Sequence, residues 1–141
     1  MKRINFAKNW NFKLYSKAFS TIRLENSEKY IVGKEYAVWL GEEVHSCAVL
    51  VSARVLPLSE LTEEMAYLDT GLSLKKTKEL LCEFYPEMCE DTPIHYLIFS
   101  ITRLRPYGRS IMPESQEIDD YLDRELIPKI DIDKKKFSTV D

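Results

Sequence analysis

The chain has 141 residues, 45% of them hydrophobic and 30% charged, with a formal net charge of −3. A chain of this length and composition forms one globular domain and buries enough surface to fold without a metal or a disulfide framework. Its apolar runs are shorter than the roughly 20 residues that span a bilayer, and no apolar signal segment follows Met1, so we expect a cytoplasmic protein without a membrane partner.

The first 36 residues carry a positive charge in an otherwise acidic chain. They hold eight Lys and Arg against three Glu, a net charge of +5, while the remaining residues carry −8. Residues 4–6 alternate as a short strand, and the spacing of Trp10, Lys13 and Leu14 predicts a short helix over residues 8–14. A basic segment of this kind can attract an anion such as phosphate, although solvated surface lysines give the same pattern.

Residues 19–24 predict a strand with two unlike faces. Side chains alternate along a strand, so Thr21 and Arg23 share one face while Ile22 and Leu24 share the other. Because Ile22 and Leu24 are apolar, we expect their face to meet the core and Thr21 and Arg23 to point away from it.

A hairpin and a long strand are predicted next. Gly33 supplies a turn before a strand over residues 36–40, and Gly41 supplies a turn into a strand over residues 44–56. Both faces of the 44–56 strand are largely apolar, which is typical of a strand inside a barrel or a covered sheet.

Two helices and a last strand follow. Ser59 is a good N-cap for a helix over residues 60–68, and Gly71 can close that helix in the left-handed conformation. Ser73 caps a second helix, whose apolar stripe we assign to packing. Residues 94–101 predict a final strand that is apolar on both faces.

The chain changes character after residue 104. We therefore divide it into a domain over residues 1–104 and a C-terminal extension over residues 105–141. The extension predicts one amphipathic helix over residues 115–126, followed by a mobile tail. That helix supports one hypothesis for function, a regulatory or structural protein that docks on another chain or self-associates through it.

No motif for catalysis, cofactor binding or metal binding occurs in the sequence. Glycine-rich phosphate loops and the serine and zinc hydrolase signatures are absent. His45 and Cys47 share a strand face, but two ligands do not make a zinc site, and Cys47 continues an apolar face. The three cysteines contain no Cys-x-x-Cys pair, so we expect reduced thiols, no metal and no cofactor.

Four stretches of sequence carry a family resemblance. They are FSTIR at 19–23, YIVGKEYAVWL at 30–40, LSELTEEMAYLDTG at 58–71 and HYLIFSI at 95–101. In this order they resemble the ASCH domain of the PUA-like superfamily, in the variety found in small bacterial and phage proteins, over roughly residues 2–103. The resemblance implies an α+β fold, a mixed β-barrel of about five to six strands flanked by short helices.

The resemblance also implies a function and a set of site residues. ASCH domains are thought to bind RNA or nucleotide-like ligands in a cleft beside the barrel, so the leading hypothesis is a binding module with such a partner. The residues expected to contact the ligand are Lys8, Trp10, Lys17, Thr21, Arg23 and Asp69. The basic side chains and Thr21 would donate to phosphate, and Trp10, Trp39 or Tyr30 would offer a stacking face.

An enzyme is the alternative. Bacterial acetylcytidine amidohydrolases, one ASCH branch, use a lysine, a threonine and a glutamate. Here Thr21 matches the threonine, Lys17 lies one residue out of step with the lysine, and Asp69 lies near the glutamate with a shorter side chain. In this alternative Thr21 is the nucleophile, Lys17 the base and Asp69 the proton donor. Because a slip of one residue turns a strand side chain to the opposite face, the sequence favours a binding module over an enzyme.

Overall fold

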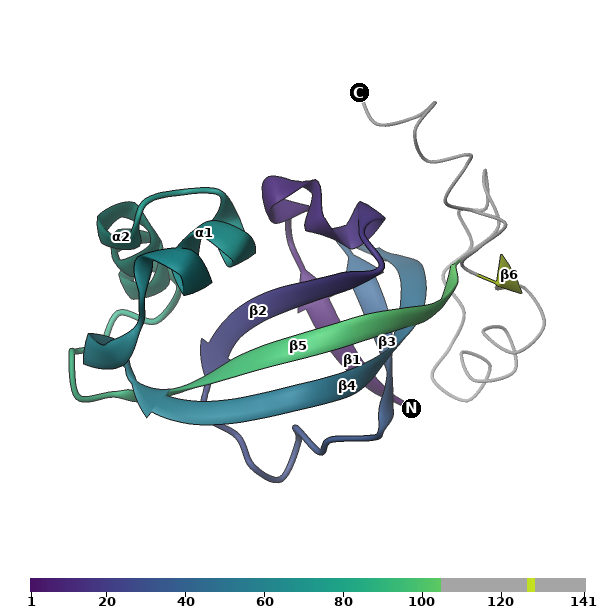
Figure 1. Ribbon diagram of the computed structural model, residues 1–141, viewed down its shortest axis with the longest axis horizontal. Helices are drawn as coiled ribbons and strands as arrows, with labels where there is room; N and C mark the ends of the chain where they lie inside the picture. The colour runs from purple at the N-terminus through teal and green to yellow at the C-terminus, as the bar shows by residue number, and fades with distance from the viewer. Residues whose placement is uncertain (105–126, 129–141) are drawn as a thin grey trace.

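The structure, a computed structural model, describes residues 1–104 and 127–128 (Figure 1). Its centre is a curled, mixed sheet of five strands in the order β1-β3-β4-β5-β2, which gives an α+β half-barrel. These strands are β1 (Lys2–Phe6), β2 (Ala18–Leu24), β3 (Glu35–Leu40), β4 (Glu43–Pro57) and β5 (Pro93–Leu104). A two-residue strand, β6 (Ile127–Pro128), pairs with β5. The helices are the 3-10 helices η1 (Trp10–Tyr15) and η2 (Leu58–Glu60), and the α-helices α1 (Glu63–Thr70) and α2 (Leu74–Phe84).

The two edge strands of the curled sheet approach each other through side chains. Among the described strands, β1 pairs only with β3, in parallel, and β2 pairs only with β5, antiparallel. Phe6 from β1 meets Phe19 from β2 edge-on, with ring centroids 5.6 Å apart, and Phe19 stacks on Phe99 at 5.4 Å. A main core therefore fills the inside of the half-barrel, while a seam runs between β1 and β2.

A second core explains why the β4 and β5 sequences are apolar on both faces. Leu56, Ile94 and Tyr96 pack beneath α1 and α2, on the face of the sheet opposite to the main core. Figure 1 shows the two helices gathered over one end of the long β4–β5 ladder. Apolar burial on two sides covers most of β5, as its sequence predicted. In β4 the prediction is only partly confirmed, because Val51 and Val55 are each 53% exposed.

The predicted alternation along residues 44–56 is interrupted. The pairing of β4 with β5 shifts register between Cys47 and Ala48 and again between Leu50 and Ser52. Such irregularities bend a strand and increase its twist, which is how one long strand follows the curled sheet.

The boundaries of the first α-helix differ from the prediction. Residues 58–60 form the separate turn η2, and the N-cap of α1 is Thr62, whose hydroxyl accepts from the Met65 amide at 3.2 Å, so the assignment to Ser59 is wrong. The predictions for Gly71 and Ser73 are confirmed. Gly71 closes α1 with φ of +77°, and the Ser73 hydroxyl accepts from an amide in the first turn of α2.

The predicted helix over residues 8–14 is a kinked 3-10 segment. Asn11 and Phe12 inside η1 have φ of 56° and 52°, the left-handed region, so two short turns replace one continuous helix. The Asn11 amide donates to the Tyr67 carbonyl at 3.4 Å. Asn11 therefore contacts α1 while its backbone is in the left-handed conformation, which costs free energy for any residue other than glycine.

Two sequence predictions concern the C-terminal extension. The helix over residues 115–126 and the tail after it lie outside the described residues, so both stay predictions. In the part of the chain that the structure does describe, no helix is long and apolar enough to cross a membrane.

Candidate functional site

A cavity of about 210 Å³ opens at the seam between the edge strands. β1 and β2 form one side of it, and the end of α1 and the last turns of α2 form the other. Its wall includes Trp10, Thr21, Arg23, Asp69, Phe84 and Tyr85. Four of the six predicted site residues therefore share one cavity with two aromatic side chains that the sequence did not single out.

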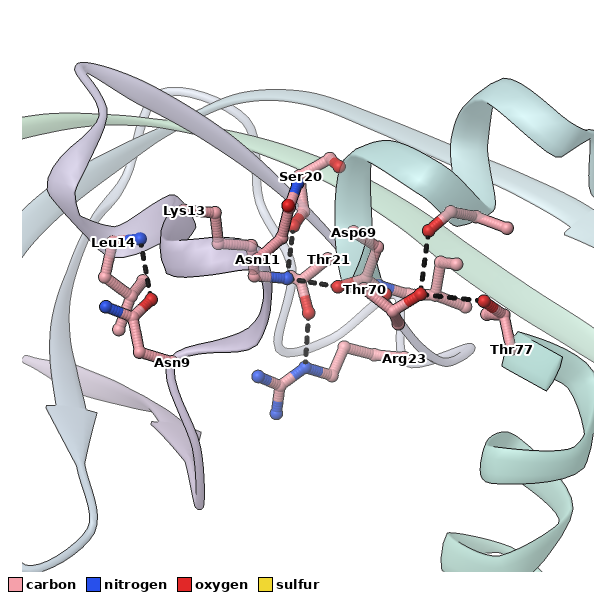
Figure 2. A network of polar contacts seen from close by, with 12 residues as sticks. Asn9, Asn11, Lys13, Leu14, Ser20, Thr21, Arg23, Asp69, Thr70 and Thr77 are labelled. Carbon is pink, nitrogen blue, oxygen red and sulfur yellow. Dashed lines mark hydrogen bonds and ion pairs between the residues drawn. The ribbon is translucent and has the colours of Figure 1, made fainter. Parts of the chain in front are cut away.

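A buried ion pair lies beside this cavity. Lys13 of η1, only 4% exposed, bonds to Asp69 of α1, and its Nζ also donates to the Ser20 carbonyl at 2.6 Å (Figure 2). The other carboxylate oxygen of Asp69 accepts from the Ile22 amide at 3.1 Å. The Lys13 amine and the Asp69 carboxylate, with the Ser20 carbonyl and the Ile22 amide, thus join η1, α1 and β2.

The position of these contacts follows from the pairing of β2. On an antiparallel edge strand, alternate residues turn their backbone groups toward the neighbouring strand and toward the open side. Ser20 and Ile22 turn theirs toward the open side, and Lys13 and Asp69 supply the partners there. The ion pair therefore covers part of the open edge of β2, where the backbone of a further strand could otherwise pair with it.

Burial sets the electrostatics of Lys13. It lowers the pKa of the amine below its ordinary value, Asp69 opposes that shift, and the charge of Arg23 adds to it. Desolvation outweighs the attraction of Asp69. Removing an ammonium group from water costs roughly several kcal/mol, even after the surrounding protein has adjusted to the charge. Lys13 is thus an amine that is easier to deprotonate than an exposed lysine.

The Arg23 guanidinium group is held in place through its Nε nitrogen. Its Nε donates to the Thr21 hydroxyl at 3.0 Å, and its Cζ lies 4.6 Å from the centre of the Phe6 ring. Among the described residues, no carboxylate forms an ion pair with Arg23. The two Nη nitrogens are therefore available to an anion in the cavity.

The predicted division of β2 into a core face and an outer face is partly wrong: Ile22 meets a core and Thr21 and Arg23 share a face as predicted, but Thr21 is buried and Leu24 is exposed. Phe19 and Thr21 are buried on the side of the main core, and half-buried Arg23 follows them. Ile22 is buried in the second core under the helices, while Leu24 is 38% exposed. Both faces of β2 are covered because the sheet curls beneath α1 and α2.

The remaining predicted residues lie apart from one another. Lys17 is exposed and does not line the cavity, so it does not take the place that the amidohydrolase hypothesis gives it. Lys8 is exposed, with its Nζ 4.5 Å from the centre of the Trp10 ring at the cavity wall. Trp39 and Tyr30 are 1% and 9% exposed, which removes both as stacking faces.

Lys13 is the site residue that sequence reasoning missed. The helical spacing of Trp10, Lys13 and Leu14 places this lysine on the apolar side of a short helix. This position was the one feature of the sequence that could have indicated a buried lysine. A buried lysine requires a partner, and only the fold shows that Asp69, distant in sequence, is that partner.

The structure offers no metal centre among residues 1–104. In this range no group of three or more His, Cys, Asp or Glu side chains lies close enough to hold an ion. Cys47 is fully buried, and His45 contacts the Ser46 hydroxyl at 3.0 Å.

Comparisons with known proteins show the fold alone. No family model matches the sequence, and no curated protein matches it. Among solved structures, the chain is similar to protein EF3133 from Enterococcus faecalis V583, described with the family model DUF984. The TM-score is 0.53 and the identity 16%, over 61% of this chain and 61% of that one. The similarity spans less than two thirds of either chain and supports a shared small α+β fold.

Proposed function

We propose that this protein is an ASCH-type, PUA-like binding module whose seam cavity holds a nucleotide-like ligand or one unpaired nucleotide of RNA. The observation that carries this proposal is Arg23, fixed through Nε by Thr21 and unpaired with any described carboxylate at its Nη nitrogens. An arginine held in this way is already oriented for a planar or tetrahedral anion, because its fork donates two parallel hydrogen bonds.

The charge around the cavity supports an anionic ligand. Asp69 is the one acidic residue in the cavity wall, and its charge is compensated by Lys13. The strand and loop residues on the other side belong to the basic first 36 residues of the chain. Lys8 adds a positive charge next to Trp10.

The aromatic wall supports a ligand with a flat ring. Trp10 is half-buried, and Phe84 keeps 54% of its surface exposed although it lines the cavity. Stacking of an unpaired base on such a side chain contributes about 1–3 kcal/mol. An anion contact and a stacking face in one cavity match the two chemical parts of a nucleotide.

Fluorescence titration with short single-stranded RNA at two salt concentrations tests this function. We expect saturable binding that weakens with salt, because released counterions contribute to affinity. Replacing Arg23 by Gln should weaken RNA binding by about 1.5–3 kcal/mol, which is roughly 10- to 150-fold. Arg54→Gln is the matched control, since Arg54 is exposed and does not line the cavity. Equal losses for both variants, or no saturable binding, would remove the proposal.

The amidohydrolase is the second candidate function, and the Lys13–Asp69 pair is the observation that favours it. Lys13, rather than Lys17, supplies an amine of lowered pKa that contacts Asp69 and the carbonyl of Ser20, the residue before Thr21. A base of lowered pKa is what activation of a hydroxyl requires near neutral pH. In this version Thr21 is the nucleophile and Lys13 replaces Lys17 as its base.

Incubation with acetylcytidine decides between the two candidates. Deacylation that is lost in Thr21→Val but kept in Lys17→Ala would support the enzyme. If the wild-type protein shows no turnover under conditions where it binds nucleotide, the binding module alone stands.

A further inference from the structure

Two exposed thiols share a second cavity, on the far side of α2 from the site. Cys82 of α2 and Cys89 of the loop before β5 both line this space of about 610 Å³, together with Met88. Cys47, the third cysteine, is fully buried in the sheet. The chain therefore presents one pair of accessible thiols and one thiol that is shielded.

Two contacts hold the segments that carry this pair against each other. The Cys82 thiol lies 3.9 Å from the carbonyl oxygen of Met88, the residue just before Cys89. One turn earlier on α2, Lys78 pairs with Glu90, the residue just after Cys89, at 3.1 Å. Cys89 is thus bracketed by two contacts to the same face of α2.

Thr92 prepares the Cys89 thiol for reaction. Its hydroxyl accepts from the Cys89 amide at 2.9 Å and lies 3.5 Å from the Cys89 sulfur, to which it can donate. This hydrogen bond, together with one from the Asp91 backbone, lowers the pKa of Cys89. The thiolate is the reactive form of cysteine, and Cys89 is exposed.

We propose that Cys82 and Cys89 form a reversible intramolecular disulfide when the protein reacts with hydrogen peroxide. The Cys89 thiolate attacks one peroxide oxygen, the O–O bond breaks, and water leaves after proton transfer, so that Cys89 becomes a sulfenic acid. The Cys82 thiol then attacks that sulfur, the S–S bond forms, and a second water leaves. Two thiols lose two electrons and one peroxide gains them, so the reaction balances.

The disulfide would act on the seam cavity. The ring that it closes contains Phe84 and Tyr85, which belong to the wall of that cavity. Oxidation therefore constrains the segment that carries the aromatic wall, and we expect it to change ligand affinity. This consequence rests on the proposed function, whereas formation of the disulfide does not.

Peroxide treatment of the full chain, followed by mass spectrometry of the intact protein and of its non-reduced peptides, tests the disulfide. We expect the mass to fall by two hydrogen atoms, a linked peptide that contains Cys82 and Cys89, and full reversal by dithiothreitol. Cys82→Ser should instead gain oxygen at Cys89, and Thr92→Val should slow the reaction while keeping both thiols. Cys89→Ser should lose the rapid reaction.

Three results would overturn the proposal. They are disulfide-linked dimers in place of the internal bond, oxygen addition to the wild-type protein without a linked peptide, and equal reaction rates in Thr92→Val and wild type. RNA titration of the oxidised and reduced protein then tests the consequence alone. Unchanged affinity with a confirmed disulfide would leave the modification site standing and remove its effect on the cavity.

Discussion

At the scale of single residues, the site contains a buried contact between two charged side chains, Lys13 and Asp69. Each charge is nearly excluded from water, and each also satisfies a backbone group of β2. Removing one partner of such a pair leaves the other charge uncompensated, which costs about 3–5 kcal/mol, while replacing both by apolar groups is often close to neutral.

Single and double substitutions of this pair should therefore not be additive. We expect Asp69→Leu and Lys13→Met each to lower the free energy of unfolding by about 3–5 kcal/mol, and the double variant to lose much less than their sum. Urea denaturation of the four proteins measures this coupling. Additive losses would contradict a direct, buried interaction between the two side chains.

His95 gives the fold a pH dependence. It is 3% exposed, its Nδ1 accepts from the Asn26 amide at 3.0 Å, and its ring packs edge-on against Tyr30. Burial lowers the pKa of His95 below the ordinary 6.5, with Glu25 opposing in part. Because the unfolded chain binds more protons at acid pH, the stability that neutral His95 contributes is present above pH 6.5 and is lost as pH falls through the folded pKa.

Chemical denaturation across this pH range checks the prediction. The free energy of unfolding of the wild type should decline as the pH falls below 6.5. His95→Asn keeps an acceptor for the Asn26 amide without titrating, so its curve should decline less. Parallel curves for the two proteins would show that another group causes the dependence.

At the scale of elements, the site depends on how closely η1 approaches the end of α1. Asn11 reaches α1 in a left-handed conformation, and a Cβ added to Gly71 would lie 3.0 Å from the Asn11 side-chain oxygen. This approach brings the segment that carries Lys13 to the helix that carries Asp69. A glycine is needed there for both its positive φ and its small size.

Two glycine variants separate these requirements. Gly41→Ala introduces a side chain at φ of +61° with nothing within 4 Å, so it should cost only the left-handed strain of about 1–2 kcal/mol. Gly71→Ala adds the clash with Asn11 and should cost more, with a fall in RNA affinity that Gly41→Ala does not show. Equal losses of stability in urea denaturation would mean that the close approach has no energetic effect.

The elements also show what the sequence could and could not predict. Alternation and capping residues located β2, β3, β4, β5 and α2, because these are local properties of the chain. Thr21 and Arg23 share a face as predicted, but the expectation that this face points away from the core was wrong, because both sides of β2 are covered and a local pattern does not show how a sheet curls. Lys13 was missed because its partner is 56 residues away, and buried pairing is a tertiary property.

At the scale of the whole molecule, the unclosed sheet provides the site. Its edge strands do not pair with each other, and the cavity opens along their seam, against the helices drawn in teal in Figure 1. The basic N-terminal segment supplies β1, η1 and β2, whereas the acidic remainder supplies the opposite wall. In the cavity lining itself, Arg23 comes from the basic segment, and the one acidic residue, Asp69, is compensated by Lys13.

In the proposed function, Arg23 binds an anion through its Nη nitrogens while its Nε keeps the hydrogen bond to Thr21. Nuclear magnetic resonance of the arginine side chains during addition of cytidine monophosphate tests it most directly, with cytidine and inorganic phosphate as comparison ligands. We predict a saturable shift of the Arg23 Nη signals with the nucleotide, a smaller shift with cytidine, and little change at Nε. Arg23 signals that stay unchanged at saturating nucleotide, or shifts confined to other arginines, would contradict the account.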